Sequence, residues 1–220
     1  MKRSEMRNIE VTNEMLDALR ERVKPYMKEK RYLHTLGVER ECAAIGELLL
    51  PDKVNKLRAA ALLHDITKML SLEKQLKLCR TFGIIYGTND LSSPKLFHAK
   101  TAAALIGRDF PEFADDEIIS AVRWHTTGRR DMSVFEGIVY LSDYIEETRE
   151  FDECVELRRY FWDSVAEKKL ALAQIYCMTM IKSFDLTLNN LIEEKAPIDF
   201  DTVDARNFFI ETYREIYYEI

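Results

Sequence analysis

Apolar residues recur along the chain at the spacing of amphipathic α-helices. Leu16, Leu19 and Val23, for example, lie three and four positions apart, so they would share one face of a helix. A period of two, which is typical of strands, forms no convincing ladder. The helical period predicts helices over residues 16–23, 33–49, 54–65, 72–81, 95–108, 116–125, 133–147, 164–194 and 204–218. The pattern therefore favours an all-α fold.

Polar residues mark where several of these helices begin. Ser71 stands directly before the fourth helix, where a serine side chain can cap free backbone N–H groups. Ser133 and Glu136 have the spacing of a capping box, in which each side chain bonds to the backbone of the other residue. Ser164 and Glu167 repeat this spacing before a long apolar-periodic stretch. We therefore expect three helices to begin at these serines.

Turn-forming residues are concentrated in one segment. Residues 82–94 hold two of the seven glycines, together with Asn, Asp, Ser and Pro, so we predict a long loop there. The sequence has no Asn-Gly or Asp-Gly pair, the dipeptides typical of tight hairpins. Its 220 residues are enough for one large domain or for a domain with a small extension. The expected architecture is an all-α bundle.

Composition and charge narrow the class of protein. Hydrophobic residues make up 47% of the chain and charged residues 32%, a balance that suits a globular protein with a sizeable core. The net charge is -6 and the isoelectric point is about 5.4. Such a chain is a poor binder of nucleic acid, which relies on lysine and arginine to replace counterions. A small phosphate ligand in a locally positive pocket remains compatible with this charge.

Neither a membrane span nor a secretory signal is expected. No apolar run approaches the roughly 20 residues that a transmembrane helix needs, and residues 1–15 lack the apolar stretch of a signal peptide. The cysteines are far apart and form no Cys-x-x-Cys pair, which disfavours a thiolate zinc site. We expect all four to be reduced, buried thiols in a cytoplasmic protein: Cys42, Cys79, Cys154 and Cys177.

All of the histidines fall in or at the ends of predicted helices, among apolar neighbours. They are His34, His64, His98 and His125. Asp65 directly follows His64, and Asp143 lies in an apolar helical turn, where a buried carboxylate needs a partner. Imidazole and carboxylate together form the ligand set of hydrolytic iron, manganese, zinc, cobalt or nickel sites. Taken alone, these residues leave two readings open, a metal site or separately paired core residues.

Longer segments around these residues resemble a known family. The segments are RYLHTLGV, ALLHDITK, FHAKTAAAL, AVRWHTTGRRDMSVFEGIVYLSDYIEETR and DTVDARN. They resemble the HD phosphohydrolase superfamily and, within it, the YqeK family of bacterial symmetrical diadenosine tetraphosphate hydrolases. The resemblance covers about residues 26–207. It implies a single HD-type helical domain over residues 1–220, with a core at about 26–150 and a helical extension at about 151–220.

The resemblance also implies a ligand set and a reaction. His34, His64, Asp65 and Asp143 would hold one metal ion, and Asp65 would bridge to a second ion held by His98 and His125. The resemblance suggests two iron ions, although manganese, cobalt, nickel or zinc would suit the same ligands. Metal-bound hydroxide would attack an inner phosphorus of a dinucleoside tetraphosphate, which would yield two nucleoside diphosphates. Asp65 and Lys68 are the expected catalytic residues.

Phosphate contacts are expected from residues next to these ligands. Lys68 follows Asp65 by about one helical turn, and its alternative role is that of a solvated lysine. The other candidates are Thr126, Arg129 and Arg149, since guanidinium groups suit phosphate oxygens. Arg130 is a weaker candidate, and Thr127 shares with Thr126 the alternative of capping a helix end. The roles open to Asp204 and Arg206 are contact with a base, contact with a ribose, or packing.

Aromatic residues flank several of the ligands: Tyr32, Trp124, Tyr140 and Tyr144. They are expected in the core, with nucleobase stacking as the alternative. Two segments depart from the family pattern. Ala99-Lys100-Thr101 replaces a glycine-containing motif, and Glu147 replaces a proline in the pattern IEP.R. Neither change removes a ligand.

Three other functions compete with this interpretation. A hydrolase of nucleoside or deoxynucleoside mono- or triphosphates would use the same fold, but a mononuclear enzyme would not require His98 and His125. A nucleotide-binding regulatory module with little turnover is disfavoured by the intact ligand set. An interaction protein without a site would leave the six polar residues unexplained. Residues 208–220 could form a packed last helix or a homodimer surface, and residues 150–197 suggest no function.

Overall fold

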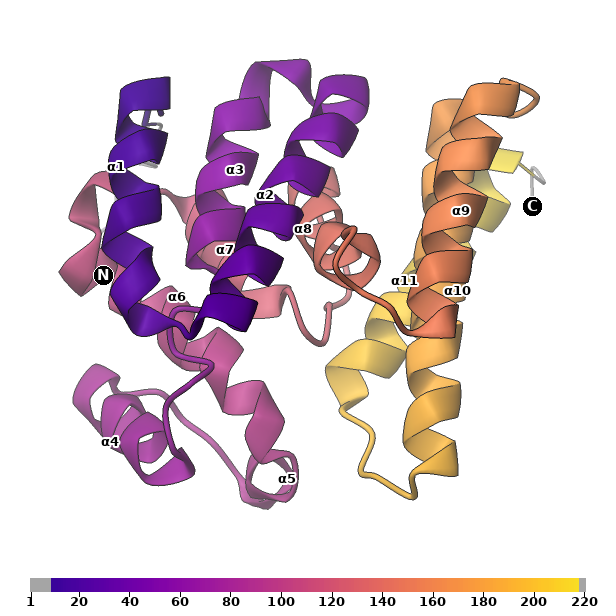
Figure 1. The fold of residues 1–220 in the computed structure, drawn as a ribbon. Coiled ribbons are helices and arrows are strands. Elements are labelled where there is room, and N and C mark those ends of the chain that lie inside the picture. Colours follow the sequence, from indigo (N-terminus) through magenta and orange to yellow (C-terminus); the bar gives the residue numbers. More distant parts are fainter. Residues whose placement is uncertain (1–8, 218–220) are drawn as a thin grey trace.

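The computed structural model describes residues 9–217, except the side chains of residues 89, 216 and 217. These residues form eleven α-helices and no strand, which confirms the all-α prediction (Figure 1). The helices are α1 (Asn13–Val23), α2 (Glu29–Leu49), α3 (Val54–Leu63), α4 (Leu72–Phe82), α5 (Thr88–Ser92), α6 (Phe97–Asp109), α7 (Asp116–Trp124), α8 (Val134–Ile145), α9 (Asp152–Glu167), α10 (Leu172–Glu193) and α11 (Phe200–Tyr217).

Two of the predicted helix starts are confirmed in atomic detail. Ser71 accepts a hydrogen bond from the backbone N–H of Lys74 at 3.4 Å, at the start of α4. Ser133 and Glu136 form the complete capping box at the start of α8. The Ser133 N–H donates to Glu136 Oε2 at 2.7 Å, and the Glu136 N–H donates to Ser133 Oγ at 3.2 Å. This cap fixes where α8, the helix of Asp143, begins.

The third predicted start, at Ser164, is wrong. Ser164 and Glu167 lie in the last turn of α9, which already begins at Asp152. Lys168 then adopts a left-handed conformation (φ 54°) that ends α9, and α10 begins only at Leu172. The spacing of a capping box thus occurs here inside a helix, where the backbone N–H groups are already bonded to carbonyls.

Two further expectations are corrected. The predicted loop at residues 82–94 contains the short helix α5, whose start is tied by the Gly87 N–H donating to Asp90 Oδ2 at 2.9 Å. The last helix begins at Phe200, four residues earlier than expected, because Asp199 Oδ1 accepts from the Asp201 N–H at 2.9 Å. Its predicted end, residue 218, lies outside the described residues.

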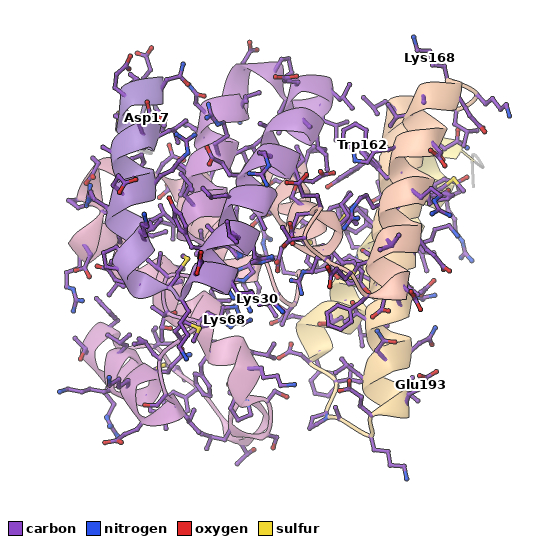
Figure 2. The ribbon with its side chains drawn as sticks, in the orientation of Figure 1. Asp17, Lys30, Lys68, Trp162, Lys168 and Glu193 are labelled. Atoms are coloured by element: carbon purple, nitrogen blue, oxygen red, sulfur yellow. The ribbon has the colours of Figure 1, made fainter. Side chains whose placement is uncertain are left out.

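Figure 1 shows α9, α10 and α11 as a layer beside α8, while α1 to α8 form the larger body. One apolar core runs through both parts, from Val11 to Phe209. Tyr140 of α8 stacks on Phe184 of α10 with ring centroids 4.6 Å apart. Trp162, which Figure 2 labels on α9, donates its indole N–H to Glu41 Oε1 of α2 at 2.7 Å. The layer is therefore fixed to the body by both apolar and polar contacts.

The cysteine prediction is confirmed in its structural part, since all four cysteines are buried and free of disulfides. Among residues 9–217, none of the helices combines the length and the apolar composition needed to cross a membrane.

Candidate metal centre

The six predicted metal ligands come together in space, although they span 110 positions of the chain. His34 lies on α2, His98 in the first turn of α6 and Asp143 on α8. His64 and Asp65 follow the end of α3, and His125 follows the end of α7. All are buried except Asp143, whose side chain is 19% exposed. Helix ends and buried helix faces thus place the six side chains around one point.

Hydrogen bonds orient three of the histidines in the same way. His64 and His125 each stand one residue past a helix and donate Nδ1–H to the carbonyl three residues back, at 2.6 and 2.7 Å. These carbonyls belong to last turns, where no helical N–H remains to bond them. His98 donates likewise to the carbonyl of Lys95 at 2.5 Å. With Nδ1 protonated, each ring directs the lone pair of Nε2 toward the centre.

His34 is held differently, by a carboxylate. Its Nδ1–H donates to Glu146 Oε1 at 3.0 Å, and Glu146 is fully buried at the end of α8. Thr148 donates twice to the same carboxylate, from its backbone N–H at 2.7 Å and from its hydroxyl at 2.6 Å. Glu146 was not predicted as a site residue. The sequence signal was its place beside the buried Ile145, where a carboxylate needs a partner.

Asp65 lies between two pairs of histidines, with one carboxylate oxygen toward each pair. Its Oδ1 is 3.2 Å from His98 Nε2 and 3.7 Å from His125 Nε2. Its Oδ2 is 3.4 Å from His64 Nε2 and 4.0 Å from His34 Nε2. A carboxylate in this position can bind two ions at once.

Asp143 completes one of the two sides of the centre. Its Oδ1 is 3.0 Å from His34 Nε2 and 3.8 Å from His64 Nε2. Two groups of ligand atoms each lie within 4.8 Å of one another, and they share His64: His34, His64 and Asp143, and His64, Asp65 and His125. Nitrogen and oxygen donors in such groups suit divalent transition metals.

The unsatisfied atoms of the cluster fit bound cations. Three buried atoms have no hydrogen-bond partner: His34 Nε2, His64 Nε2 and Asp65 Oδ1. His98 Nε2 and His125 Nε2 are 2.9 Å apart, and the lone pairs of both point inward because both Nδ1–H groups donate elsewhere. Unsatisfied buried polar atoms are costly in a folded protein. Metal ions would satisfy all of these atoms together.

The ionisation states of His98, His125 and the two aspartates suit metal binding. Burial lowers the pKa of His98 to about 4 and lowers the pKa of His125, so both rings keep a free lone pair at neutral pH. Burial alone would raise the pKa of Asp143, but Arg149 and His34 hold that pKa well below its usual value. The surrounding histidines do the same for the pKa of Asp65. The two aspartates are therefore ionised.

Positive side chains surround the ligands. Lys68 Nζ is 3.1 Å from His98 Nε2, and burial lowers the pKa of this lysine. Arg149 Nη2 donates to Asp143 Oδ1 at 2.8 Å. Arg31, which was not predicted, donates from Nη1 to Asp65 Oδ2 at 2.9 Å. Figure 2 labels Lys68, and also Lys30, which precedes Arg31 at the N-terminal end of α2.

The other predicted substrate residues lie in different surroundings. Thr126 Oγ1 is 3.3 Å from His98 Nε2, at the centre. The guanidinium of Arg129 is held by the buried Glu136 through two hydrogen bonds of 2.9 and 3.0 Å. Arg130 pairs with Glu211 at the surface.

The residues with open roles lie mainly in packing contacts. Arg206 pairs with Asp185, which joins α11 to α10. Tyr140 is buried in the stack with Phe184. The guanidinium of Arg123 covers the Trp124 ring, with its carbon 3.9 Å from the ring centroid.

An all-α bundle that gathers four histidines and two aspartates around unsatisfied nitrogen and oxygen atoms has the donor set of a helical protein that binds divalent metal ions. The model of one family, described as the HD domain, matches residues 31–148, which include all six ligands. The chain therefore belongs to the HD-domain family.

Curated relatives extend the similarity beyond this domain. The symmetrical bis(5'-nucleosyl)-tetraphosphatase of Bacillus subtilis is 30% identical and covers 86% of this chain, with 94% of the relative matched. The protein of the same name from Halalkalibacterium halodurans is 32% identical over 84% of this chain and 91% of its own length.

A solved structure shares the fold. It is that of a predicted HD superfamily hydrolase involved in NAD metabolism from Clostridium acetobutylicum. It is 29% identical, has a TM-score of 0.79, and the match covers 92% of this chain and 100% of that one. The C-terminal helices are thus part of the shared fold.

Proposed function

We propose that this chain is a metal-dependent phosphohydrolase that cleaves dinucleoside tetraphosphates, such as diadenosine tetraphosphate, symmetrically into two nucleoside diphosphates. The observation that carries the proposal is the placement of Asp65, whose two oxygens face different histidine pairs. Two relatives named for this activity, each matched over more than four fifths of this chain, support the substrate.

In this proposal His34, His64, Asp65 and Asp143 would hold one ion, and Asp65, His98 and His125 would hold the second. Iron is the proposed metal, while manganese, cobalt, nickel and zinc would suit the same donors. Bound divalent ions lower the pKa of a water molecule toward neutrality and polarise a phosphoryl group. The hydrogen bonds to Nδ1 prepare the histidines for this role, since they fix the orientation of each ring.

The positive side chains supply the contacts to substrate. Lys68, Arg149 and Arg31 reach the centre from three different elements, so they can surround a polyphosphate bridge. Charged hydrogen bonds of guanidinium groups to phosphate are strong and directional. Thr126 can donate its hydroxyl from beside His98. Arg129 remains a predicted phosphate contact, although Glu136 engages its guanidinium here.

A second candidate is the hydrolysis of nucleoside or deoxynucleoside mono- or triphosphates at the same centre. The similar Clostridium protein is described as a predicted hydrolase involved in NAD metabolism. This description is a reason to test other nucleotides as substrates. A substrate panel separates the candidates. We expect kcat/KM for diadenosine tetraphosphate to exceed that for dATP and for AMP by about 100-fold or more. A preference for dATP or AMP would favour the second candidate, and binding without turnover would favour a regulatory module.

The remaining proposals concern setting and partners. We expect a cytoplasmic enzyme whose partner is its nucleotide substrate rather than nucleic acid or a membrane. Residues 208–220 stay a candidate homodimer surface, although residues 218–220 lie outside the described part of the chain. Sedimentation of the purified protein would test the dimer.

A further inference from the structure

The four histidines of the centre are not supported alike. His64, His98 and His125 donate Nδ1–H to backbone carbonyls, which are neutral. His34 donates to the carboxylate of Glu146, which carries a full negative charge. An imidazole supported by a carboxylate is the stronger metal ligand, because the charge stabilises the positive character that the ring gains on binding. The two sides of the centre therefore differ in the strength of their donors.

The charged groups near the two sides also favour a metal ion on the side of His34. The His34 side has Asp143, one oxygen of Asp65 and the Glu146 carboxylate. Arg31 and Arg149 pair with the two aspartates, but no lysine or arginine of the described residues forms an ion pair with Glu146.

The His98 side shares the other oxygen of Asp65. There, Lys68 Nζ lies 3.1 Å from His98 Nε2 and 4.0 Å from Asp65 Oδ1. An ammonium group at this distance opposes a divalent cation. Arg31 and Arg149 oppose an ion on the His34 side in the same way, but that side has two carboxylates of its own, Asp143 and Glu146. The His98 side has none beyond the shared Asp65, so the charge distribution favours an ion on the side of His34.

Glu146 sits in a space that the surrounding residues leave for it. A Cβ added at Gly37, one turn past His34 on α2, would lie 2.1 Å from Glu146 Oε2, so a larger residue would displace the carboxylate. The carboxylate accepts three hydrogen bonds, one from His34 and two from Thr148. Glu146 is therefore held in a fixed position, as support for a metal ligand requires.

We propose that Glu146 is a positioning residue that makes the side formed by His34, His64 and Asp143 the tighter metal subsite, while the side formed by His98 and His125 binds its ion more weakly. The inference rests on the metal centre of the proposed function. It adds an order of binding and assigns that order to a residue outside the ligand set.

Titration of the metal-free full chain with Co²⁺, followed by visible absorption and native mass spectrometry, tests this order. We expect wild type to bind two equivalents, with dissociation constants at least about tenfold apart. His98→Ala should remove the weaker step and keep the tighter one. Glu146→Gln should weaken the tighter step about 10- to 100-fold and leave the weaker step in place.

Glu147→Gln is the matched control, because Glu147 is the exposed neighbour and pairs with Arg40 at the surface. It should titrate like wild type. Thr148→Val removes the hydroxyl, one of the three donors to Glu146, and should weaken the tighter step in the same direction. This variant therefore tests the role of Glu146 if circular dichroism shows Glu146→Gln to be unfolded.

Equal affinities of the two steps in wild type would overturn the inference, as would an unchanged tighter step in Glu146→Gln. A wild-type protein that binds no Co²⁺ would instead overturn the metal centre of the proposed function itself.

Discussion

Arg31 contacts the proposed ligand Asp65, and we propose that it also contacts a phosphate of the substrate. Its guanidinium contacts Asp65, yet its side chain is 29% exposed, so one face remains accessible. We expect Arg31→Gln to lower kcat/KM for diadenosine tetraphosphate about 10- to 100-fold, mainly through KM, because a charged hydrogen bond to phosphate contributes about 1.5–3 kcal/mol. Steady-state kinetics beside metal analysis would measure this.

Lys30→Gln serves as the control for that experiment, since Lys30 is the exposed neighbour of Arg31 on α2. It should leave KM unchanged. If Arg31→Gln lost its bound metal while KM for the remaining holoenzyme stayed the same, Arg31 would act on Asp65 alone and not on substrate.

Arg129 has two roles that a variant can separate. The sequence predicts a phosphate contact, whereas the structure shows its guanidinium bonded to the buried carboxylate of Glu136. We expect Arg129→Gln to lower the free energy of unfolding by about 1–3 kcal/mol, because Glu136 would lose its charged partner. Urea denaturation would measure the loss. A raised KM at unchanged stability would instead support the phosphate contact.

At the scale of the elements, Glu41 links α2 to α9 and makes the stability of that contact depend on pH. Burial raises the pKa of Glu41 to about 7, despite the hydrogen bond from Trp162. The folded protein therefore holds a proton at Glu41 that the unfolded chain releases at about pH 4.5. Since the folded state binds more protons in this window, its stability is full below about pH 4.5 and falls as pH rises through 7.

Replacement of Glu41 by glutamine tests whether ionisation of Glu41 lowers the stability as pH rises. The amide oxygen of Gln can still accept from Trp162, but it does not ionise. We expect Glu41→Gln to match wild type at pH 4 and to be more stable by about 3 kcal/mol at pH 8, as measured by urea unfolding. Glu47→Gln, an exposed site on the same helix, should follow wild type at both pH values. A Glu41→Gln variant that is less stable at pH 8 would contradict the account.

Sequence patterns predicted elements well where local signals agreed. The starts of α4 and α8 follow from Ser71 and Ser133, whose caps need only neighbours three positions away. The prediction at Ser164 was wrong because Ser164 and Glu167 have the same spacing as Ser133 and Glu136 but lie inside α9. The end of α9 depends instead on the left-handed conformation of Lys168. Spacing alone does not distinguish a helix start from a helix interior.

The residues of the candidate site were predictable in part. The six proposed ligands followed from residue types and from the family resemblance, and the structure brings these six side chains close together. Arg31 and Glu146 were missed because their partners lie 34 and 112 positions away in the chain. The partner of Arg129 is seven positions away, across the start of α8, where no helical spacing connects them. Such partners become visible only once the helices are packed.

At the scale of the whole molecule, the C-terminal layer supports the centre through the segment after His125. Gly128 has a φ of 66°, and a Cβ there would lie within 3 Å of Phe184 and Ala205. The layer thus packs directly against the turn that follows a metal ligand. Because one apolar core includes residues of both parts, the two parts should unfold together.

Calorimetry tests this coupling. We expect one transition for wild type and a loss of about 3–5 kcal/mol for Phe184→Ala, since a large buried ring would be replaced by a cavity. Two separate transitions in wild type would contradict a shared core. Phe151→Ala provides a control with little effect expected, since that ring is 63% exposed.

Symmetrical cleavage at a metal centre built around Asp65 can be tested by chromatography of the reaction products. Anaerobically purified, iron-loaded protein would act on diadenosine tetraphosphate, with Asp65→Ala in parallel. We expect ADP as the sole product of wild type, and neither bound metal nor ADP for Asp65→Ala. AMP with ATP as products would rule out symmetrical cleavage, and undiminished turnover by Asp65→Ala would rule out the role of Asp65.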